Sequence, residues 1–365
     1  MNVSYDFGGL RAQLDAFMPE SVIKRLCKED KIDRDIALSE IKQEFIESHK
    51  EEIEQSETPE SVINYLFDNV LKDKVTELMF AISKRVDNRD FDQVRKIEVE
   101  VGLLPFTHGS ALFKRGRTQA LVTVTLGSGE DEQRRETLMS DEDEGDGSFM
   151  LHYNFPPFSV GEAKFLRGPG RREIGHGSLA ASAFKYVRPD KQEFPYTIRI
   201  VADVLESNGS TSMATTCGAT MAMLQAGVPI SRMVSGIAMG LIKDKKGDFK
   251  VLSDITGFED AFGLMDFKVA GTDKGITAIQ MDIKYKGGLT REIFEKALEQ
   301  ARTGRLHILD KMKAVMDKPS ESLSPLVPRV ITFKIDTDKI GAVIGSGGKT
   351  IREIIDVTKT SIDIE

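Results

Sequence analysis

The chain has 365 residues, of which 40% are hydrophobic and 30% are charged, and its formal net charge is -8. This length allows two or three domains, and the composition is ordinary for a globular protein that buries a sizeable core. The acidic balance excludes a histone-like or polybasic protein, although a local basic groove on an acidic protein can still bind nucleic acid.

The number of cysteines and the hydropathy of the sequence exclude further classes of protein. The two cysteines, Cys27 and Cys217, cannot make a disulfide framework or a four-ligand zinc site, which favours a reducing compartment. The sequence has no run of about 18 apolar residues and therefore predicts no membrane span. The N-terminus lacks a basic region followed by an apolar stretch, so it is not a secretory signal.

Residues 1–85 are predicted to form an all-helical domain. Apolar residues of segment 60–82 recur at three- and four-residue spacing, which places them on one helical face; they are Val62, Ile63, Leu66, Val70, Leu71, Val75 and Leu78. Ser61 is a candidate cap for this helix. Since the region contains no cluster of reactive residues, we expect it to act in packing or as a linker.

From residue 86 the pattern changes to short β-rich runs, glycine-rich turns and apolar helices, which predicts an α/β or α+β domain that spans 86–318 together with the helix that follows. The predicted strands are 120–126, 149–155, 196–205, 237–242 and 277–284, and the predicted helices are 179–187, 213–226 and an amphipathic helix within 290–318. The acidic, turn-rich stretch 127–147 is predicted to be a solvated loop. Prolines mark a linker at 319–329, and a further domain begins at 330 with a strand over 330–335.

The first candidate site is the Ser/Thr-rich turn in ESNGSTSMATTCG, residues 206–218. A strand is expected to end near Glu206 and a helix to begin after the turn. Unpaired N–H groups at a helix N-terminus attract anions. Thr211 and Ser212 would add hydroxyl donors, and Gly209 would let the backbone approach an anion. A plain helix cap would have the same sequence, so both interpretations stay open at this point.

The second candidate site lies in SDITGFEDAFGLMDFKVAG, residues 253–271. If Asp266 begins a strand, Asp266 and Lys268 share one face while Phe267 points into the core. Asp260 would lie on the loop that leads into the strand. Two carboxylates and an ammonium suit a hard cation together with a phosphate oxygen, although a salt-bridged loop would show the same pattern.

Two further motifs contain basic residues or a glycine-rich loop. In GPGRREIGHG, Arg171 and Arg172 could clamp phosphates, and His176 lies between glycines where a flexible backbone would admit a ligand, unless that histidine is structural. In IGSGGKTI, Gly345 and Gly348 bracket Ser346 and Gly347, and Lys349 follows. Such a loop between helices lets a nucleotide backbone pass close to the main chain. It lacks the glycine spacing of a phosphate-binding Walker loop.

Taken together, these motifs resemble the bacterial polynucleotide phosphorylase family. The matching segments are RVDNRDFDQVRKIEVEVGLLPFTHGSALFKRGRTQALVTVTLG, FMLHYNFPPFSVGE, RREIGHG, ESNGSTSMATTCG, GIAMGLI and EDAFGLMDFKVAG, which occur in the order of the family. The resemblance implies a central helical domain at 1–85, a second ribonuclease-PH-like core with the ribosomal-protein-S5-like βαβα arrangement at 86–318, and the start of a KH domain at 330–365. The chain is therefore expected to be a fragment that lacks the first core.

The resemblance also assigns roles to the candidate residues. It implies phosphate binding by Ser210, Thr211, Ser212 and His176, and RNA binding by Arg171, Arg172, Gly345, Ser346, Gly347, Gly348 and Lys349. It implies catalysis by Asp260, Asp266 and Lys268, with Mg²⁺ or Mn²⁺ held on the two aspartates. The sequence departs from the family pattern at Phe258 and Leu264, where aspartate is common, at Phe106, where arginine is frequent, and at Asn88, where glycine is usual.

The activity that the resemblance implies is 3′→5′ phosphorolysis of RNA, reversible, in which inorganic phosphate releases nucleoside diphosphates during RNA degradation and mRNA turnover. The implied setting is a cytoplasmic homotrimer that binds single-stranded RNA and joins an endonuclease or a helicase, with no membrane contact. Two alternatives remain: a hydrolytic exoribonuclease of related fold, and a non-catalytic RNA-binding half. The isolated fragment is expected to be weakly active or inactive, because the two cores of the family complete each other's sites.

Overall fold

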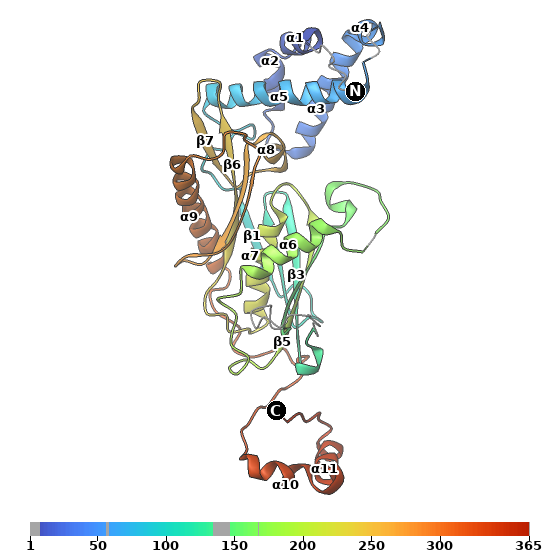
Figure 1. Cartoon of the computed structure of the whole chain (residues 1–365), viewed down its shortest axis with the longest axis vertical. Helices are drawn as coiled ribbons and strands as arrows, with labels where there is room; N and C mark the ends of the chain where they lie inside the picture. The colour runs from blue at the N-terminus through green and yellow to red at the C-terminus, as the bar shows by residue number, and fades with distance from the viewer. Residues whose placement is uncertain (1–7, 56–57, 134–146, 167, 365) are drawn as a thin grey trace. The chain divides into compact units, whose positions relative to one another are not determined.

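The computed structural model describes residues 8–55, 58–133, 147–166 and 168–364. It separates into two compact units, Met1–Val327 and Pro328–Glu365, and each is described by itself (Figure 1). Within the described ranges, no helix is long and apolar enough to cross a membrane.

The first unit begins with a helical region. Its elements are α1 (Gly8–Phe17), α2 (Glu20–Ile23), the 3₁₀ turn η1 (Lys24–Leu26), α3 (Lys31–Ser48), α4 (Lys50–Gln55) and α5 (Glu60–Ile82). The predicted apolar face of α5 is confirmed, since all of its residues except the half-buried Val62 are buried. The predicted cap was wrong. The helix begins directly after Pro59, whose extended backbone precedes the first turn, so Ser61 lies inside that turn.

Two β-sheets follow the helical region. The first contains β1 (Ile97–Val101), β2 (Gly109–Arg115), β3 (Thr118–Gly127), β4 (Phe149–Asn154) and β5 (Thr197–Glu206), in the order β1-β2-β3-β5-β4. The second contains β6 (Ser235–Lys243), β7 (Phe249–Ser253), β8 (Met265–Gly271) and β9 (Ile276–Ile283), in the order β7-β6-β8-β9. The five predicted strands of the core are confirmed as β3, β4, β5, β6 and β9, within two residues at each end.

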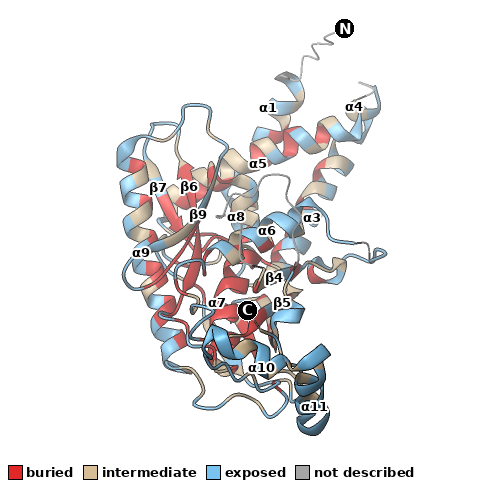
Figure 2. Cartoon of the chain, turned by 60° about the horizontal axis from the view of Figure 1, so that its bottom comes forward, coloured by how far each residue is buried: buried red, intermediate tan, exposed pale blue. Residues whose placement is uncertain are grey.

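A buried helix joins the two sheets. Helix α7 (Thr211–Gln225) contacts β2 and β3 of the first sheet and β6 and β8 of the second. Its residues 211–224 are all buried, as Figure 2 shows, because they are small or apolar on every side. Helix α9 (Arg291–Lys313) packs on β6 and β7, and the short helix α8 (Gly257–Phe262) leads into β8. The resulting fold is α+β, as predicted.

Helix α6 (Arg171–Ser182) connects the parallel strands β4 and β5, so β4, α6, β5 and α7 make the expected βαβα order. The predicted helix 179–187 was misplaced, because it left the preceding glycines in a loop. Gly177 instead lies in the helix, where a Cβ would come within 3.3 Å of Tyr153 Cβ, so glycine serves close packing of α6 on β4. Short 3₁₀ turns occur at η2 (Gly129–Asp131) and η3 (Pro157–Val160). The rest of the predicted acidic loop, 134–146, lies outside the described residues.

The second unit contains η4 (Thr337–Lys339), α10 (Ile340–Ile344), η5 (Ser346–Gly348) and α11 (Lys349–Thr358). The predicted strand over 330–335 is not formed in the residues that the structure describes there. A strand needs neighbouring strands to bond its backbone, and this short unit offers none among its described residues.

Candidate active site

A carboxylate and an ammonium lie side by side at the start of β8. Asp266 Oδ2 is 3.0 Å from Lys268 Nζ, which also donates to Gln280 Oε1 on β9 at 3.3 Å. Phe267 between them is fully buried, so the predicted alternation along this strand is confirmed. The Asp266 Oδ1 atom is buried without a hydrogen-bond partner among the described residues. Burial raises the pKa of Asp266, while Lys268 opposes that shift.

Asp260 lies in helix α8 rather than on the predicted loop. Thr256 begins this helix with a reciprocal capping box to Glu259, which explains why the segment folds as a helical turn. Lys284, beyond the end of β9, donates to the Asp260 carboxylate at 2.9 Å and to its carbonyl at 2.6 Å. Asp260 raises the pKa of Asp266, which indicates that the two carboxylates share one electrostatic neighbourhood.

The Ser/Thr-rich turn forms the N-terminus of α7. Ser210 precedes the helix in the left-handed region at φ 40°, and its side chain makes no capping hydrogen bond. The hydroxyls of Ser210 and Ser212 are buried without a partner among the described residues. Buried hydroxyls normally have partners, so this arrangement favours a ligand site over a plain cap. Ser212 is 0% exposed, so its hydroxyl is enclosed by protein.

Gly209 has a packing role that the sequence did not predict. A Cβ at this position would lie 2.3 Å from the Ile255 carbonyl oxygen, and the backbone φ is +92°. Glycine is therefore required because the segment before α8 packs directly on the turn, and the space beside Gly209 is already filled. This contact brings the serine turn of α7 and the aspartate helix α8 close together.

A tyrosine on β4 links the serine turn to His176. Tyr153 Oη lies 2.5 Å from Thr211 Oγ1 and 3.4 Å from His176 Nδ1, and the Tyr153 and His176 rings meet edge to face. Burial raises the pKa of Tyr153 to about 12, so its hydroxyl stays protonated. The predicted flexible loop around His176 was wrong, since His176 lies within helix α6.

His176 is held as a neutral imidazole. Burial, together with the positive charges of Lys268 and Arg172, lowers its pKa to about 4. At neutral pH the ring therefore acts through hydrogen bonds rather than through charge. Helix α6 also contacts β9, the strand that pairs with β8, so His176 and Lys268 come from neighbouring elements. The structure thus brings Asp266, Lys268, His176 and Thr211 into one neighbourhood.

The two predicted arginines begin helix α6 and are exposed. The Arg172 guanidinium lies over the Phe155 ring, with its carbon 4.4 Å from the ring centroid. This contact holds the side chain beside the site by a cation–π interaction while its N–H groups remain available. Arg171 has no such contact in the described part of the chain.

Buried ion pairs hold the serine turn and helix α8 in place. Asp254 is fully buried, lies 2.7 Å from Arg95 Nη2 and 3.0 Å from Arg115 Nε, and has a pKa far below its usual range because of these arginines. Arg115 in turn donates to the Ser210 carbonyl at 2.8 Å. Glu259, next to Asp260, accepts a hydrogen bond from Arg85 Nε at 2.6 Å.

In the second unit, the GxxG loop turns between two helices, as predicted. Gly345, Gly347 and Gly348 all have positive φ, which other residues rarely adopt. A Cβ on Gly345 would meet Thr350 Oγ1 at 2.2 Å, whereas one on Gly347 would meet nothing within 4 Å. Gly345 is therefore needed for the turn itself, and the Gly347 side of the loop is open. Lys349 begins α11 directly after it.

Three family models match the chain. Residues 93–229 match domain 1 and residues 232–304 match domain 2 of the 3′ exoribonuclease family, and residues 330–365 match the KH domain. The two exoribonuclease models together cover more than half of the chain, which belongs to the 3′ exoribonuclease family. A solved structure of rice Rrp46 has the same fold, with a TM-score of 0.50 and 17% identity over 63% of this chain and 98% of that one.

Within this class, the chain is similar over nearly its whole length to curated polyribonucleotide nucleotidyltransferases. Identity is 52% to the protein from Pelotomaculum thermopropionicum over 98% of this chain and 47% of the relative. It is 50% to that from Anaeromyxobacter dehalogenans over 98% and 50%, and 53% to that from Caldicellulosiruptor saccharolyticus over 92% and 47%. The chain spans about half the length of these relatives.

Two aspartates of the site are candidate ligands for a divalent cation. The described residues contain no group of three or more histidine, cysteine, aspartate or glutamate side chains suited to a metal. Mg²⁺ is commonly bound by one or two carboxylates together with waters and substrate phosphates. Asp260 and the unpartnered Oδ1 of Asp266 fit that mode. They do not make a complete protein cage.

Sequence reasoning missed Tyr153, Gln280 and Lys284. Each contacts a candidate residue, at the distances given above. Tyr153 stood inside the recognised segment FMLHYNFPPFSVGE, and that membership was its only signal in the sequence. Gln280 and Lys284 lie on or just beyond β9, an edge strand whose register against β8 decides their neighbours.

Proposed function

We propose that the protein is a 3′→5′ phosphorolytic exoribonuclease that converts RNA and inorganic phosphate to nucleoside diphosphates and also runs the reverse polymerisation. One observation carries the proposal: an Asp–Lys pair on β8 lies near a serine turn whose buried hydroxyls have no hydrogen-bond partner among the described residues. The family and the polyribonucleotide nucleotidyltransferase relatives support it. We also propose the division 1–85 helical domain, 86–318 catalytic core, 319–329 linker and 330–365 KH segment.

In the proposed mechanism, the α7 N-terminus binds the attacking phosphate. The hydroxyls of Thr211 and Ser212 donate to its oxygens, and the unpaired N–H groups of the first turn add partial positive charge. Tyr153 orients the Thr211 hydroxyl, and neutral His176 supplies a further hydrogen bond. These groups position a phosphate oxygen to attack the terminal phosphodiester phosphorus.

The leaving group is the 3′-oxygen of the penultimate nucleotide. As the phosphorus–oxygen bond breaks, this oxygen takes the proton that the attacking hydrogen phosphate gives up. Lys268 stabilises negative charge at the scissile phosphate, and Arg171 and Arg172 neutralise the RNA backbone. Asp260 and Asp266 would hold Mg²⁺ or Mn²⁺, which supplies charge neutralisation at the phosphates when bound. Lys284 keeps the Asp260 carboxylate in place and competes with a cation for it.

An assay of product identity tests the function. Single-stranded RNA is incubated with the complete gene product, with and without phosphate and Mg²⁺. The released nucleotides are then separated by thin-layer chromatography. We expect diphosphates that appear only when phosphate is present. Monophosphates released without phosphate would establish the hydrolytic alternative. RNA binding without any nucleotide release would establish the non-catalytic one.

We expect Tyr153→Phe to raise the apparent KM for phosphate about 3- to 10-fold with a smaller change in kcat. The loss of one hydrogen bond, about 1 kcal/mol, leaves the Thr211 hydroxyl free to rotate away from phosphate. Initial phosphorolysis rates over a phosphate series measure the effect. Tyr186→Phe is the matched control, because Tyr186 is 73% exposed. An unchanged KM in the Tyr153 variant would show that its hydroxyl does not orient the phosphate site.

We further propose that the KH segment binds single-stranded RNA through residues 345–349, as its family match supports. Lys349→Glu is expected to weaken RNA binding about 3- to 10-fold and to reduce the salt dependence of binding by about one counterion, since one phosphate contact becomes repulsive. Binding to a labelled oligonucleotide at several salt concentrations measures this. Lys318→Glu, an exposed lysine outside the loop, is the control, and equal losses in both variants would argue against a specific loop contact.

The remaining parts of the proposal follow from the resemblance to the relatives. We propose a cytoplasmic homotrimer that acts in RNA degradation and mRNA turnover with an endonuclease or a helicase. Size-exclusion chromatography with light scattering tests the trimer, and co-purification from native extract tests the partners.

A further inference from the structure

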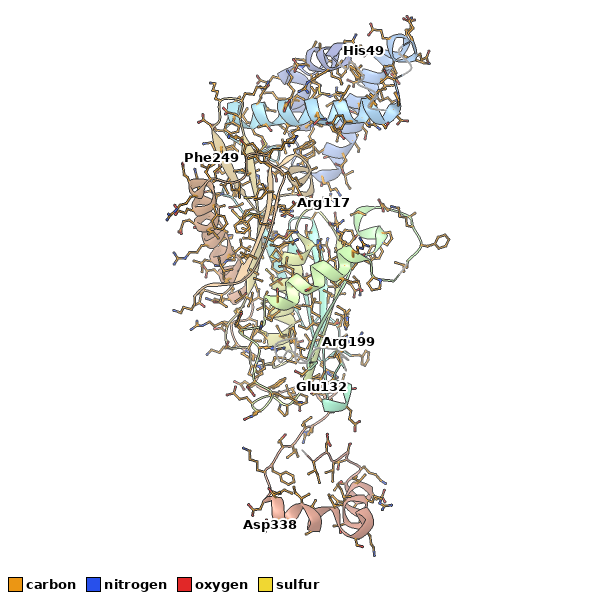
Figure 3. The ribbon with its side chains drawn as sticks, in the orientation of Figure 1. His49, Arg117, Glu132, Arg199, Phe249 and Asp338 are labelled. Atoms are coloured by element: carbon orange, nitrogen blue, oxygen red, sulfur yellow. The ribbon has the colours of Figure 1, made fainter. Side chains whose placement is uncertain are left out.

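A cavity of about 510 Å³ lies where the helical region meets the core. Its walls come from the start of α3, from the segment 87–96 before β1, and from the turn between β2 and β3. Arg117 in that turn bonds Asp30, which caps α3, and Figure 3 shows Arg117 at this junction. None of the residues proposed above for catalysis lines this cavity.

Most of the charged side chains around the cavity are already paired. Its basic lining residues are Arg34, Arg89, Arg95, Lys96 and Arg117, and its acidic ones are Glu29, Asp30 and Asp87. Four of these five basic residues already have a carboxylate partner, since Arg89 pairs with Asp87, Arg95 with Asp254, Lys96 with Glu98, and Arg117 with Asp30. Any preference of the cavity for an anion therefore rests on Arg34, the remaining basic residue.

Arg34 is the exceptional member of this group. It is 1% exposed, and no carboxylate lies within 4 Å of it in the described part of the chain. Its Nη2 donates to the Lys28 carbonyl, its guanidinium carbon is 5.6 Å from the Phe258 ring centroid, and its Nε has no hydrogen-bond partner there. A buried arginine is almost always paired with a counter-charge. Among the residues that the structure describes, Arg34 has no such counter-charge.

Phe258 lies where an acidic side chain would have supplied a counter-charge to Arg34. It precedes Glu259 in α8, packs against Phe262, and lies against the helical core. An aromatic ring here stabilises the domain contact and offers Arg34 only its π-face, which is a weak substitute for a carboxylate.

We propose that this cavity binds a small phosphate-bearing anion, with the Arg34 guanidinium as its counter-charge. Arginine suits phosphate because its planar N–H groups can donate two parallel hydrogen bonds. The volume falls within the range of small-molecule sites, about 300–1,000 Å³, and accommodates either inorganic phosphate or a mononucleotide. The inference does not depend on the proposed catalytic activity.

Binding is measured by NMR on the whole chain labelled with ¹⁵N-arginine, following the Nε–H signals during titration with inorganic phosphate, with ADP and with adenosine. The Arg34 signal is assigned by its loss in Arg34→Met. We expect it to shift with phosphate or ADP and not with uncharged adenosine. A response to ADP alone identifies a nucleotide site, and an equal response to both identifies a phosphate site. An Arg34 signal that no anion moves would overturn the proposal.

Phe258→Asp provides the second test. The introduced carboxylate would supply Arg34 with an internal counter-charge and compete with the anion. Isothermal titration of the anion that moves the Arg34 signal is expected to show at least a 10-fold loss of affinity in Phe258→Asp and in Arg34→Met, and none in Arg302→Met, an exposed control on α9. Wild-type affinity in either cavity variant contradicts the proposal. If circular dichroism shows that a variant does not fold, the response of the wild-type Arg34 signal to the anions tests the proposal instead.

Discussion

Replacing Asp266 with asparagine is expected to lower the rate of phosphorolysis about 100-fold or more at saturating phosphate. The amide keeps the shape of the side chain but removes the charge that pairs with Lys268 at 3.0 Å and that would hold a cation. The loss of one preorganised electrostatic element in an active site commonly has an effect of this size. The measurement is kcat for diphosphate release across a Mg²⁺ series.

A matched control lies directly across the sheet. Asp282 on β9 pairs in register with Asp266, but it is exposed. Asp282→Asn is expected to keep wild-type activity. Thermal unfolding of both variants checks that each folds. Full phosphorolysis by a folded Asp266→Asn protein would remove Asp266 from the mechanism.

The second large effect concerns stability rather than chemistry. Asp254→Asn is expected to lower the free energy of unfolding by about 3–5 kcal/mol, because it leaves Arg95 and Arg115 as buried charges without their shared partner. Urea denaturation followed by circular dichroism measures the change. Asp248→Asn, at an exposed turn, should leave the midpoint unchanged. A midpoint for Asp254→Asn equal to that of the control would show that the network does not hold the fold together.

The same network predicts an acid limit for the fold. Glu259 has a pKa lowered to about 2 from an ordinary value of 4.5, because Arg85 and Arg89 stabilise its charged form against burial. A depressed folded-state pKa contributes stability that is complete above the unfolded-state value. This contribution is therefore lost as the pH falls from about 4.5 to about 2. Urea midpoints measured across this range should decline, and a flat profile would contradict the role of the Arg85–Glu259 pair.

Local residue patterns in the sequence predicted much of the candidate site. The alternation at Asp266, Phe267 and Lys268 correctly placed two polar side chains on one face, because strand geometry has a fixed period of two. The glycines of residues 345–348 indicated a tight turn between helices, since their backbone conformations are ones that other residues avoid. The family resemblance, carried by contiguous segments, was also available from the sequence alone.

Only the tertiary structure could decide contacts between distant segments. Tyr153, His176 and Thr211 come from β4, α6 and α7, and their meeting depends on how the helices cross the sheet. The helical start of α6 was missed because glycine lowers helix propensity locally, while close packing on β4 outweighs that cost. Likewise, charge counting along the chain gave no sign that Arg34 is buried without a carboxylate. Residue type and short-range spacing are written in the sequence, whereas burial and the partner of each charge arise only when remote segments pack together.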